Sequence, residues 1–331
     1  MIRCSNIVRS IFVGTACTLM GGEVANSQAL QLNLASAYPQ QALISVAAQE
    51  FADRLKQETG GKITIVTNFG GALGYSSREQ YDAIEQGALH LAQYSFDNLL
   101  GLDPIYALHS LPFVSPSIDG TYAIYKKAFP FYENVFVKAN QKLLFAAAWT
   151  PVGVWAKKPI HSVDDLKGLK IRTVDPVTTE SFRRVGARPV QLAWGDVLSS
   201  LGTGVIDALV TSDESGVVAK VWEFGINHFT ALNSTTGVAP VVMNLDVYKK
   251  LSPELQKAVH KVAAEVEARA WERSKAQVQK NRATLEANGG VVLDSAPESV
   301  IVALRAAGSS AIEKWKTDVG PEAAKILDNT K

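Results

Sequence analysis

The sequence contains almost no cysteine. Its 331 residues include only Cys4 and Cys17, both close to the N-terminus. If residues 1–29 are removed, as proposed below, the remaining chain has no thiol, which excludes disulfides and thiol catalysis there. A lipid anchor on Cys17 is an alternative, but Gly14 stands where such a motif has an aliphatic residue.

The chain also lacks an excess of charge of either sign. It has 33 basic and 32 acidic residues, a formal net charge of +1. Residues 1–29 hold two of the basic and one of the acidic residues, so 31 of each remain without them. No basic surplus is available for nucleic acid or for an anionic membrane surface, and we expect no nucleic-acid partner.

The short motifs of catalysis and cofactor binding are missing as well. The sequence has no GxSxG elbow and no P-loop, and Gly202-Thr203-Gly204 lacks the third glycine of a dinucleotide loop. The histidines are scattered without metal-binding spacing, at His90, His109, His161, His228 and His260. We therefore expect no enzyme activity, no cofactor and no metal.

No apolar run beyond the N-terminus reaches the roughly 20 residues of a membrane-spanning helix. The N-terminus itself has a basic start, an apolar run over 7–20 and a small-x-small site at Ser27-Gln28-Ala29. These features are typical of a secretory signal peptide. We predict a signal peptide over 1–29, cleaved after about Ala29, and export to the periplasm.

The remaining chain alternates between strand and helix patterns, which predicts an α/β fold. With 47% hydrophobic residues it can bury a substantial core, and its length suggests about two domains. Strands are predicted at 30–35, 62–68, 89–95, 143–157, 169–174, 187–193, 205–212, 241–245 and 291–293, and the main helices at 41–57, 77–86, 121–140, 252–288 and 297–331.

One predicted helix is unusually long. Ser252-Pro253 is a good start, with a capping residue before a proline at the first helical position, and Gly289-Gly290 is a good stop. About 36 residues at 1.5 Å each span roughly 54 Å, which exceeds the width of a typical lobe. An amphipathic surface helix, straight or kinked, is the simplest interpretation.

The stretch 163–212 gathers candidate ligand-binding residues at the ends of predicted elements. Arg172 lies at the end of one strand, Trp194 begins a helix, and Thr211 and Ser212 end another strand. Ligands of open α/β sheets bind beyond the carboxyl ends of the strands, and a guanidinium group matches a carboxylate with two parallel hydrogen bonds. An arginine at a strand end is, by itself, more often an exposed surface residue.

Part of this stretch also resembles an earlier one. Residues 84–95 align without a gap on 201–212, at an offset of 117 residues. Chance similarity between two ordinary helix-to-strand units is the alternative. If the repeat is real, Tyr94 and Thr211 occupy equivalent positions, and we expect them to face each other across a cleft.

Several short sequence motifs resemble those of the receptors of TRAP transporters, the DctP-type solute-binding proteins. They are Lys158-Pro159-Ile160, the run DLKGLKIR over 165–172, Val185-Gly186-Ala187 and the run 201–207. The resemblance implies a two-lobed periplasmic-binding-protein-like fold, with a ligand cleft between the lobes and a long helix along both. We place lobe I at 30–150 plus about 239–277, and lobe II at 151–238 plus about 278–331.

The resemblance also implies roles for individual residues. Arg172 matches the arginine that binds the ligand carboxylate, and Trp194 matches a position that is often aromatic. A second arginine of some members is missing here near Val152, Thr211 or Ser212 replaces an amide, and Tyr94 replaces an acid. Each change removes charge or strong polarity, so we predict a monocarboxylate with an apolar or aromatic body. Trp149 and Tyr75 are further candidates, although core packing explains them equally well.

By this resemblance the protein is a monomeric receptor that binds a small organic acid and delivers it to the subunits of a TRAP membrane permease. Two alternatives stay open. A receptor of the same fold can serve a signalling kinase instead of a permease. An exported α/β hydrolase or lyase would need a nucleophile and base pair, which the sequence does not supply.

Overall fold

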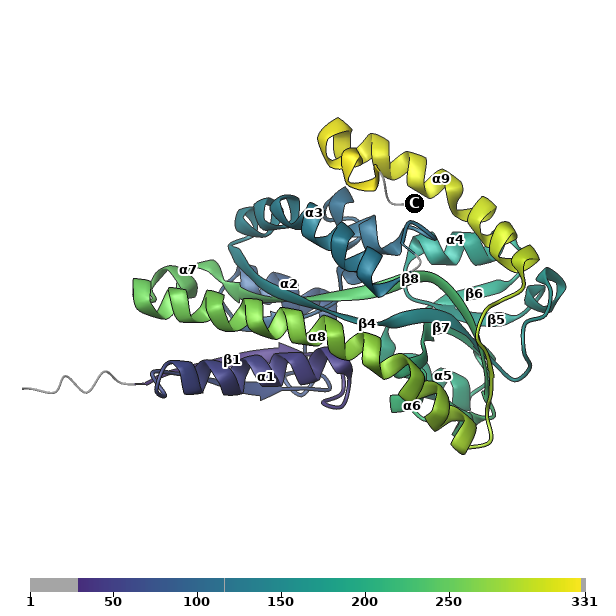
Figure 1. The fold of residues 1–331 in the computed structure, drawn as a ribbon, viewed down its shortest axis with the longest axis horizontal. Helices are drawn as coiled ribbons and strands as arrows, with labels where there is room; N and C mark the ends of the chain where they lie inside the picture. The colour runs from purple at the N-terminus through teal and green to yellow at the C-terminus, as the bar shows by residue number, and fades with distance from the viewer. Residues whose placement is uncertain (1–28, 116, 329–331) are drawn as a thin grey trace, which may run out of the picture.

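The computed structural model describes residues 29–115 and 117–328, so the predicted signal peptide lies almost wholly outside the described residues. The strands form one mixed sheet in the order β2-β1-β3-β8-β4-β7-β5-β6, with β9 paired to β8 (Figure 1). The strands are β1 (Leu30–Ser36), β2 (Ile63–Asn68), β3 (Leu91–Gln93), β4 (Gln141–Ala156), β5 (Lys170–Thr173), β6 (Arg188–Gln191), β7 (Ala208–Ser212), β8 (His228–Asn244) and β9 (Val291–Leu293).

Helices lie on both faces of this sheet (Figure 1). They are α1 (Leu43–Glu58), α2 (Ser77–Glu85), α3 (Ile118–Lys138), α4 (Pro176–Arg184), α5 (Val197–Gly202), α6 (Asp213–Val218), α7 (Leu245–Lys249), α8 (Pro253–Ala287) and α9 (Glu298–Ala324). In the described part of the chain, no helix is both long and apolar enough to cross a membrane.

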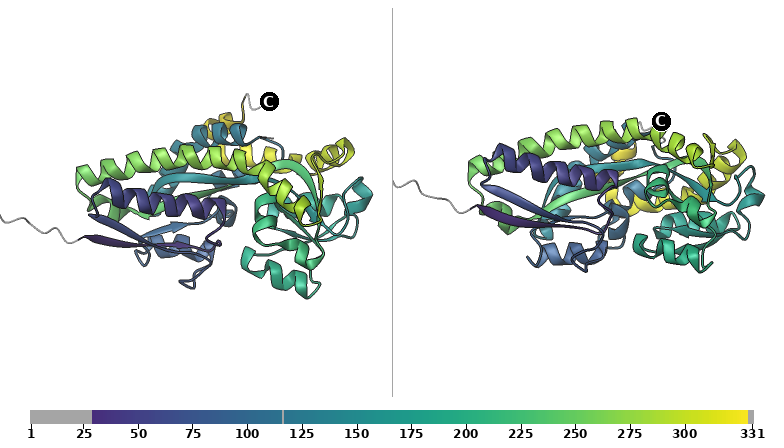
Figure 2. Two further views of the ribbon diagram at one scale, coloured as in Figure 1. Left: turned by 60° about the horizontal axis from the view of Figure 1, so that its bottom comes forward. Right: turned by 90° about the horizontal axis from the view of Figure 1, so that it is seen from below.

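The elements form two lobes, as the sequence resemblance implied (Figure 2). The first lobe contains β1 to β3 with α1 to α3, and the second contains β5 to β7 with α4 to α6. Each lobe buries its own apolar side chains, around Phe51 and Phe136 in the first and around Phe182 and Phe229 in the second. The two lobes share β4 and β8, which pair along most of their length.

The long helix predicted from the capping signals is α8, and its predicted ends are confirmed. The hydroxyl of Ser252 accepts a hydrogen bond from the backbone N–H of Leu255, and Pro253 is the first helical residue. Gly289 follows the helix with a φ of 76°, the left-handed conformation that glycine adopts most readily. The helix packs on α1 of the first lobe and on α6 of the second, so it runs along both (Figure 2).

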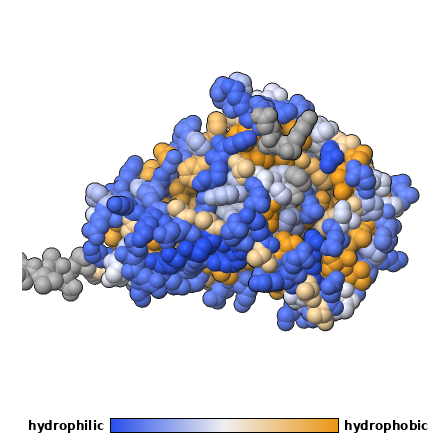
Figure 3. Space-filling model, in the orientation of Figure 1, coloured by the Kyte–Doolittle hydropathy of each residue, from blue (hydrophilic) through white to orange (hydrophobic). Residues whose placement is uncertain are grey.

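Ion pairs join α8 to α1 on the outside of the first lobe. Arg269 and Arg273 of α8 both contact Glu50 of α1, and Lys261 contacts Glu58. The Lys261–Glu58 pair is exposed, and pairs of this kind contribute only about 0–1 kcal/mol, whereas Glu50 is partly buried beneath its two arginines. The surface over α1 and α8 is accordingly hydrophilic (Figure 3).

Two segments differ from the sequence-based predictions. We predicted only a short strand at 241–245, whereas β8 is one strand of 17 residues, because it pairs with β4 in both lobes. The last part of α9 packs on the first lobe, where the indole N–H of Trp315 donates to the carbonyl of Pro104 at 2.9 Å. The sequence-based boundaries assign this part of α9 to lobe II, and those boundaries stay predictions.

Candidate functional site

A cavity of about 950 Å³ opens between the two lobes. Its walls come largely from residues at or just beyond the carboxyl ends of strands: Tyr38 after β1, Asp97 after β3, Arg172 in β5 and Ser212 in β7. This is the edge of an α/β sheet at which ligands commonly bind. Six of the seven predicted site residues line the cavity: Arg172, Trp194, Thr211, Ser212, Trp149 and Tyr75.

Arg172 is buried at the cavity wall, with 4% of its surface exposed. Its Nε and Nη2 groups both donate to the backbone carbonyl of Leu192, at 3.0 and 2.9 Å. Burial lowers the pKa of Arg172, but an arginine in a protein keeps its proton. Two of its five N–H groups are thus used to hold the side chain in place, and the other three have no hydrogen-bond partner among the described residues, so they can bind an anion.

Trp194 begins the short 3₁₀ helix Trp194–Asp196 and lies beside this guanidinium group. The carbon Cζ of Arg172 is 5.7 Å from the centre of a Trp194 ring, which is cation–π distance. Trp194 is partly exposed and lines the cavity. The tryptophan therefore offers an apolar face next to a fixed positive charge.

Trp149 of β4 also lines the cavity. Its ring meets that of Tyr38 edge to face, with the ring centres 5.1 Å apart. The hydroxyl of Tyr38 donates to Oδ1 of Asn98 at 3.1 Å. Gly237 of β8 packs against the Trp149 ring, where an added Cβ would lie 2.9 Å from a ring carbon. These contacts fix the position of the Trp149 ring. Because most of the side chain is buried, only a small part of it is accessible from the cavity.

Thr211 and Ser212 end β7 at the cavity, and both are largely buried. The Ser212 hydroxyl accepts a hydrogen bond from the backbone N–H of Ser215 at 3.0 Å and donates to the Ser215 hydroxyl at 2.9 Å. It therefore caps α6. Its hydroxyl is already used in this cap, so Thr211 is the freer of the two.

The prediction that Tyr94 faces the ligand cleft is wrong. Tyr94 is fully buried in the first lobe, where its ring packs between Tyr81 and Phe136 and its hydroxyl bonds to Gln141. It does not line the cavity. Successive residues of an extended chain point to opposite faces, and here the face of Tyr94 is covered by α2 and α3. The sequence alignment of Tyr94 with Thr211 therefore did not predict that the two side chains point in different directions, Thr211 to the cavity and Tyr94 to the core.

Several cavity residues were missed from the sequence: Tyr38, Asp97, Asn98, Asp175 and Glu214. Burial raises the pKa of Asp97 to about 6, and that of Glu214 to about 7. The strand ends before Tyr38 and Asp97 were visible in the sequence and could have suggested them by the rule that led to Arg172.

Glu214 connects the two lobes across the cavity. Its Oε1 accepts a hydrogen bond from the backbone N–H of Leu43 at 3.0 Å, and its Oε2 accepts one from the Ser215 hydroxyl at 3.4 Å. Leu43 is the first residue of α1, whose own N-cap residue Ala42 supplies no side-chain bond. A carboxyl group of the second lobe therefore caps a helix of the first.

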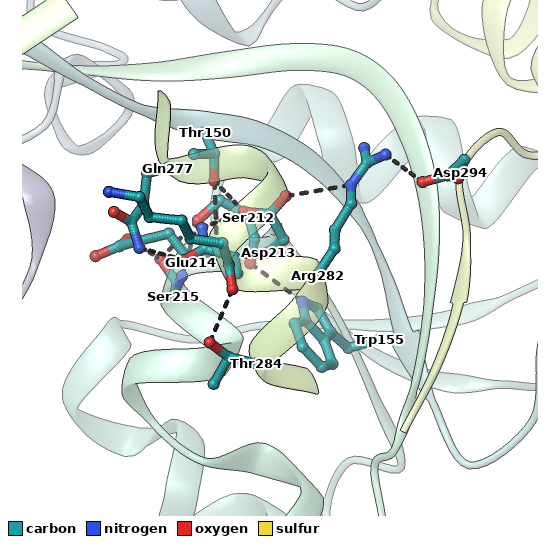
Figure 4. Close-up of polar contacts among 12 residues, drawn as sticks. Thr150, Trp155, Ser212, Asp213, Glu214, Ser215, Gln277, Arg282, Thr284 and Asp294 are labelled. Atoms are coloured by element: carbon teal, nitrogen blue, oxygen red, sulfur yellow. Dashed lines mark hydrogen bonds and ion pairs between the residues drawn. The ribbon is translucent and has the colours of Figure 1, made fainter. Parts of the chain in front are cut away.

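The neighbouring Asp213 ties the second lobe to the shared strand β4 and to α8 (Figure 4). Its Oδ1 accepts hydrogen bonds from the hydroxyl of Thr150 in β4 and from the amide of Asn281 in α8, both at 2.6 Å. Arg282 of α8 lies 3.9 Å from its Oδ2. The start of α6, which carries Glu214, is thus anchored on both shared elements.

Substitution of Glu214 should change how the free energy of unfolding depends on pH, because its carboxyl group is buried. Burial raises its pKa from 4.5 to about 7, so the folded protein keeps a proton that the unfolded chain releases. Stability from this group is then lost as the pH rises from about 4.5 to about 7. Glu214→Gln keeps an acceptor for Leu43 and cannot ionise. We expect the stability advantage of Glu214→Gln over the wild type to be small at pH 5 and larger at pH 8, by about 2–3 kcal/mol.

Urea unfolding at the two pH values measures this difference. The exposed Glu223 provides the control, because Glu223→Gln makes the same chemical change outside the cavity and should leave the difference near zero at both pH values. An equal effect of Glu214→Gln at pH 5 and pH 8 would contradict a raised pKa for this carboxyl group.

Comparison with known proteins agrees with a ligand-binding role for this cavity. A family described as bacterial extracellular solute-binding protein, family 7 (DctP), matches residues 34–318. The 2,3-diketo-L-gulonate-binding periplasmic protein YiaO of Escherichia coli (strain K12) is 27% identical over 232 residues, 66% of this chain and 67% of its own length.

Solved structures share the fold over nearly the whole chain. DctP6 of Bordetella pertussis, an extracytoplasmic solute receptor binding pyroglutamic acid, is 27% identical with a TM-score of 0.86, covering 91% of this chain and 99% of its own. A TRAP solute-binding protein from a marine metagenome, specific for pyroglutamate, is 27% identical with a TM-score of 0.84, covering 92% and 99%. The predicted resemblance is confirmed: the chain belongs to the DctP family of bacterial extracellular solute-binding proteins, the TRAP-type receptors.

Proposed function

We propose that this protein is an extracytoplasmic receptor that binds an organic acid in the cavity between its lobes and delivers it to a TRAP-type membrane permease. The observation that carries the proposal is Arg172, a buried cation held against the Leu192 carbonyl, with three N–H groups that no residue of 29–115 or 117–328 occupies. No bond is made or broken in this function. Export to the periplasm and a monomeric state belong to the same proposal.

The proposed ligand is a monocarboxylate with an apolar or aromatic body. Trp194 lies beside the guanidinium group and Trp149 lines the cavity as well, so the carbon skeleton would meet aromatic faces. Val152, which stands near the place of a second arginine in some relatives, also lines the cavity and offers no charge to a second carboxylate. Two neighbours of 27% identity are described as receptors for pyroglutamate, a compact monocarboxylate, and this supports the assignment.

A panel of organic acids tests the proposal on the purified protein without residues 1–29. A ligand present at 100 times its Kd stabilises the folded state by about 2.7 kcal/mol, which a thermal melt detects. We expect L-pyroglutamate and aromatic or branched monocarboxylates to raise Tm more than succinate or malate. Larger shifts with both dicarboxylates would contradict the ligand class. The absence of any shift across the whole panel would contradict organic-acid binding.

A further inference from the structure

The cavity contains carboxyl groups with different partners. Asp175 caps α4: its Oδ1 accepts from the backbone N–H of Thr178 at 2.8 Å, and its Oδ2 accepts from the Thr178 hydroxyl at 2.7 Å. Both carboxyl oxygens of Glu214 also accept hydrogen bonds, from Leu43 and Ser215. These two side chains are therefore engaged within the protein.

Asp97 differs from both. Its Oδ1 is buried and has no hydrogen-bond partner within residues 29–115 and 117–328, although the carboxyl group as a whole is supported by hydrogen bonds from the Ser95 side chain and the Asn98 backbone. A buried carboxyl oxygen without a donor costs free energy, so its presence calls for an explanation, and a functional role is one. Asp97 lines the cavity from the short helix Phe96–Leu99, directly after β3. The neighbouring Asn98 does have a partner, the Tyr38 hydroxyl.

Asp97 and Arg172 lie on different lobes and influence each other's charge. Burial raises the pKa of Asp97 and the nearby Asp175 raises it further, whereas a hydrogen bond from Ser95 and the charge of Arg172 oppose this rise. In return, Asp97 is the strongest of the nearby charges that support the proton of Arg172. Across the described part of the chain, no ion pair within 4.0 Å joins Arg172 to an acid. The two groups therefore line the same cavity without forming a direct ion pair.

We propose that Asp97 is a specificity-determining residue that accepts a hydrogen bond from an N–H or O–H group of the same ligand whose carboxylate Arg172 binds. This inference rests on the proposed function. It narrows the ligand class to carboxylic acids that carry such a donor, amides and hydroxy acids among them. A second carboxylate offers no donor and would repel Asp97, so dicarboxylates are disfavoured by the same residue.

Two pairs of probes test the donor. L-pyroglutamate and its N-methyl derivative differ in one N–H, and L-lactate and propionate differ in one O–H. The first change adds atoms and the second removes them, so a steric effect acts oppositely in the two pairs. By calorimetry at pH 8, above the pKa of Asp97, we expect the donor-bearing acid of each pair to bind about 10 to 100 times more tightly.

Variants assign the preference to Asp97. Asp97→Ala should reduce both preferences to near unity. Asp97→Asn keeps the shape and one acceptor oxygen but loses the charge, so it should retain part of the preference and bind succinate several times more tightly than the wild type. The matched control is Asp53→Asn, on the exposed face of α1 and outside the cavity, which should change neither ratio.

The outcomes separate this inference from the proposed function. Preferences that are absent in the wild type, or that persist in Asp97→Ala, overturn the role of Asp97 and leave organic-acid binding intact. If Asp97→Ala does not fold, unchanged succinate binding in folded Asp97→Asn overturns it equally. Binding confined to acids without an N–H or O–H donor also overturns it. Failure of every acid in the panel to bind the wild type overturns the proposed function as well.

Discussion

Replacement of Arg172 by lysine is expected to weaken binding of the carboxylate at least tenfold in a protein that still folds. Lysine keeps the charge but loses the planar fork that binds a carboxylate through two parallel hydrogen bonds. It also loses one of the two contacts that hold Arg172 on the Leu192 carbonyl. The Arg172 side chain is only 4% exposed in the wild type. At this buried position, a single ammonium group cannot bind the Leu192 carbonyl and the ligand with the geometry that the guanidinium group provides.

A neutral side chain should have a larger effect. Truncation of one member of a buried, hydrogen-bonded charge pair costs about 2–5 kcal/mol, so Arg172→Met should weaken binding by at least about thirtyfold. Calorimetry with the best acid of the panel measures both variants, and circular dichroism checks their fold. Arg188→Lys makes the same change on an exposed residue of the neighbouring strand and serves as the control. Wild-type affinity in folded Arg172→Lys would remove this residue from the site.

Replacement of Asp213 by alanine is expected to lower the free energy of unfolding by about 3 kcal/mol. The change leaves the Thr150 hydroxyl and the Asn281 amide without their acceptor, and both residues are buried. Each unsatisfied buried donor costs about 1–3 kcal/mol. The loss also detaches the start of α6 from β4 and α8, so the two shared elements no longer hold this part of the cavity wall.

Asp294 provides a control with the same arginine. It pairs with Arg282 from the outside, and its side chain is 77% exposed. Asp294→Ala should therefore change the free energy of unfolding by less than about 0.5 kcal/mol. Urea unfolding measures both variants. A loss below 1 kcal/mol for Asp213→Ala, at an unchanged m value, would show that this junction is not important for stability.

Local chemistry explains what was predictable about the fold. The ends of α8 depend on Ser252, Pro253 and Gly289, and capping acts over only a few residues. The strand that carries Arg172 is likewise recognisable from its own residues. The cavity position of Arg172 followed from the general placement of ligands at strand ends, together with the family resemblance.

Predictions that needed a side-chain direction or a distant partner were less successful. Tyr94 follows a predicted strand, but whether it faces the cavity depends on which helices cover its side of the sheet. The length of β8 depends on β4, which precedes it by more than 70 residues in the chain. Neither relation is written in the local pattern of apolar and polar residues.

The sequence by itself determined the α/β class, the long helix and the arginine at the strand end, because each depends on contacts within one element or on a local motif. The tertiary structure decided the chemistry around that arginine. Glu214 acquires its role by meeting Leu43, 171 residues away, and Asp97 by keeping one carboxyl oxygen without a donor among the described residues, beside a cavity that both lobes line. Burial and pairing across lobes are properties of the packed chain, so the pKa values of these carboxyl groups could be recognised only once the fold had brought them together.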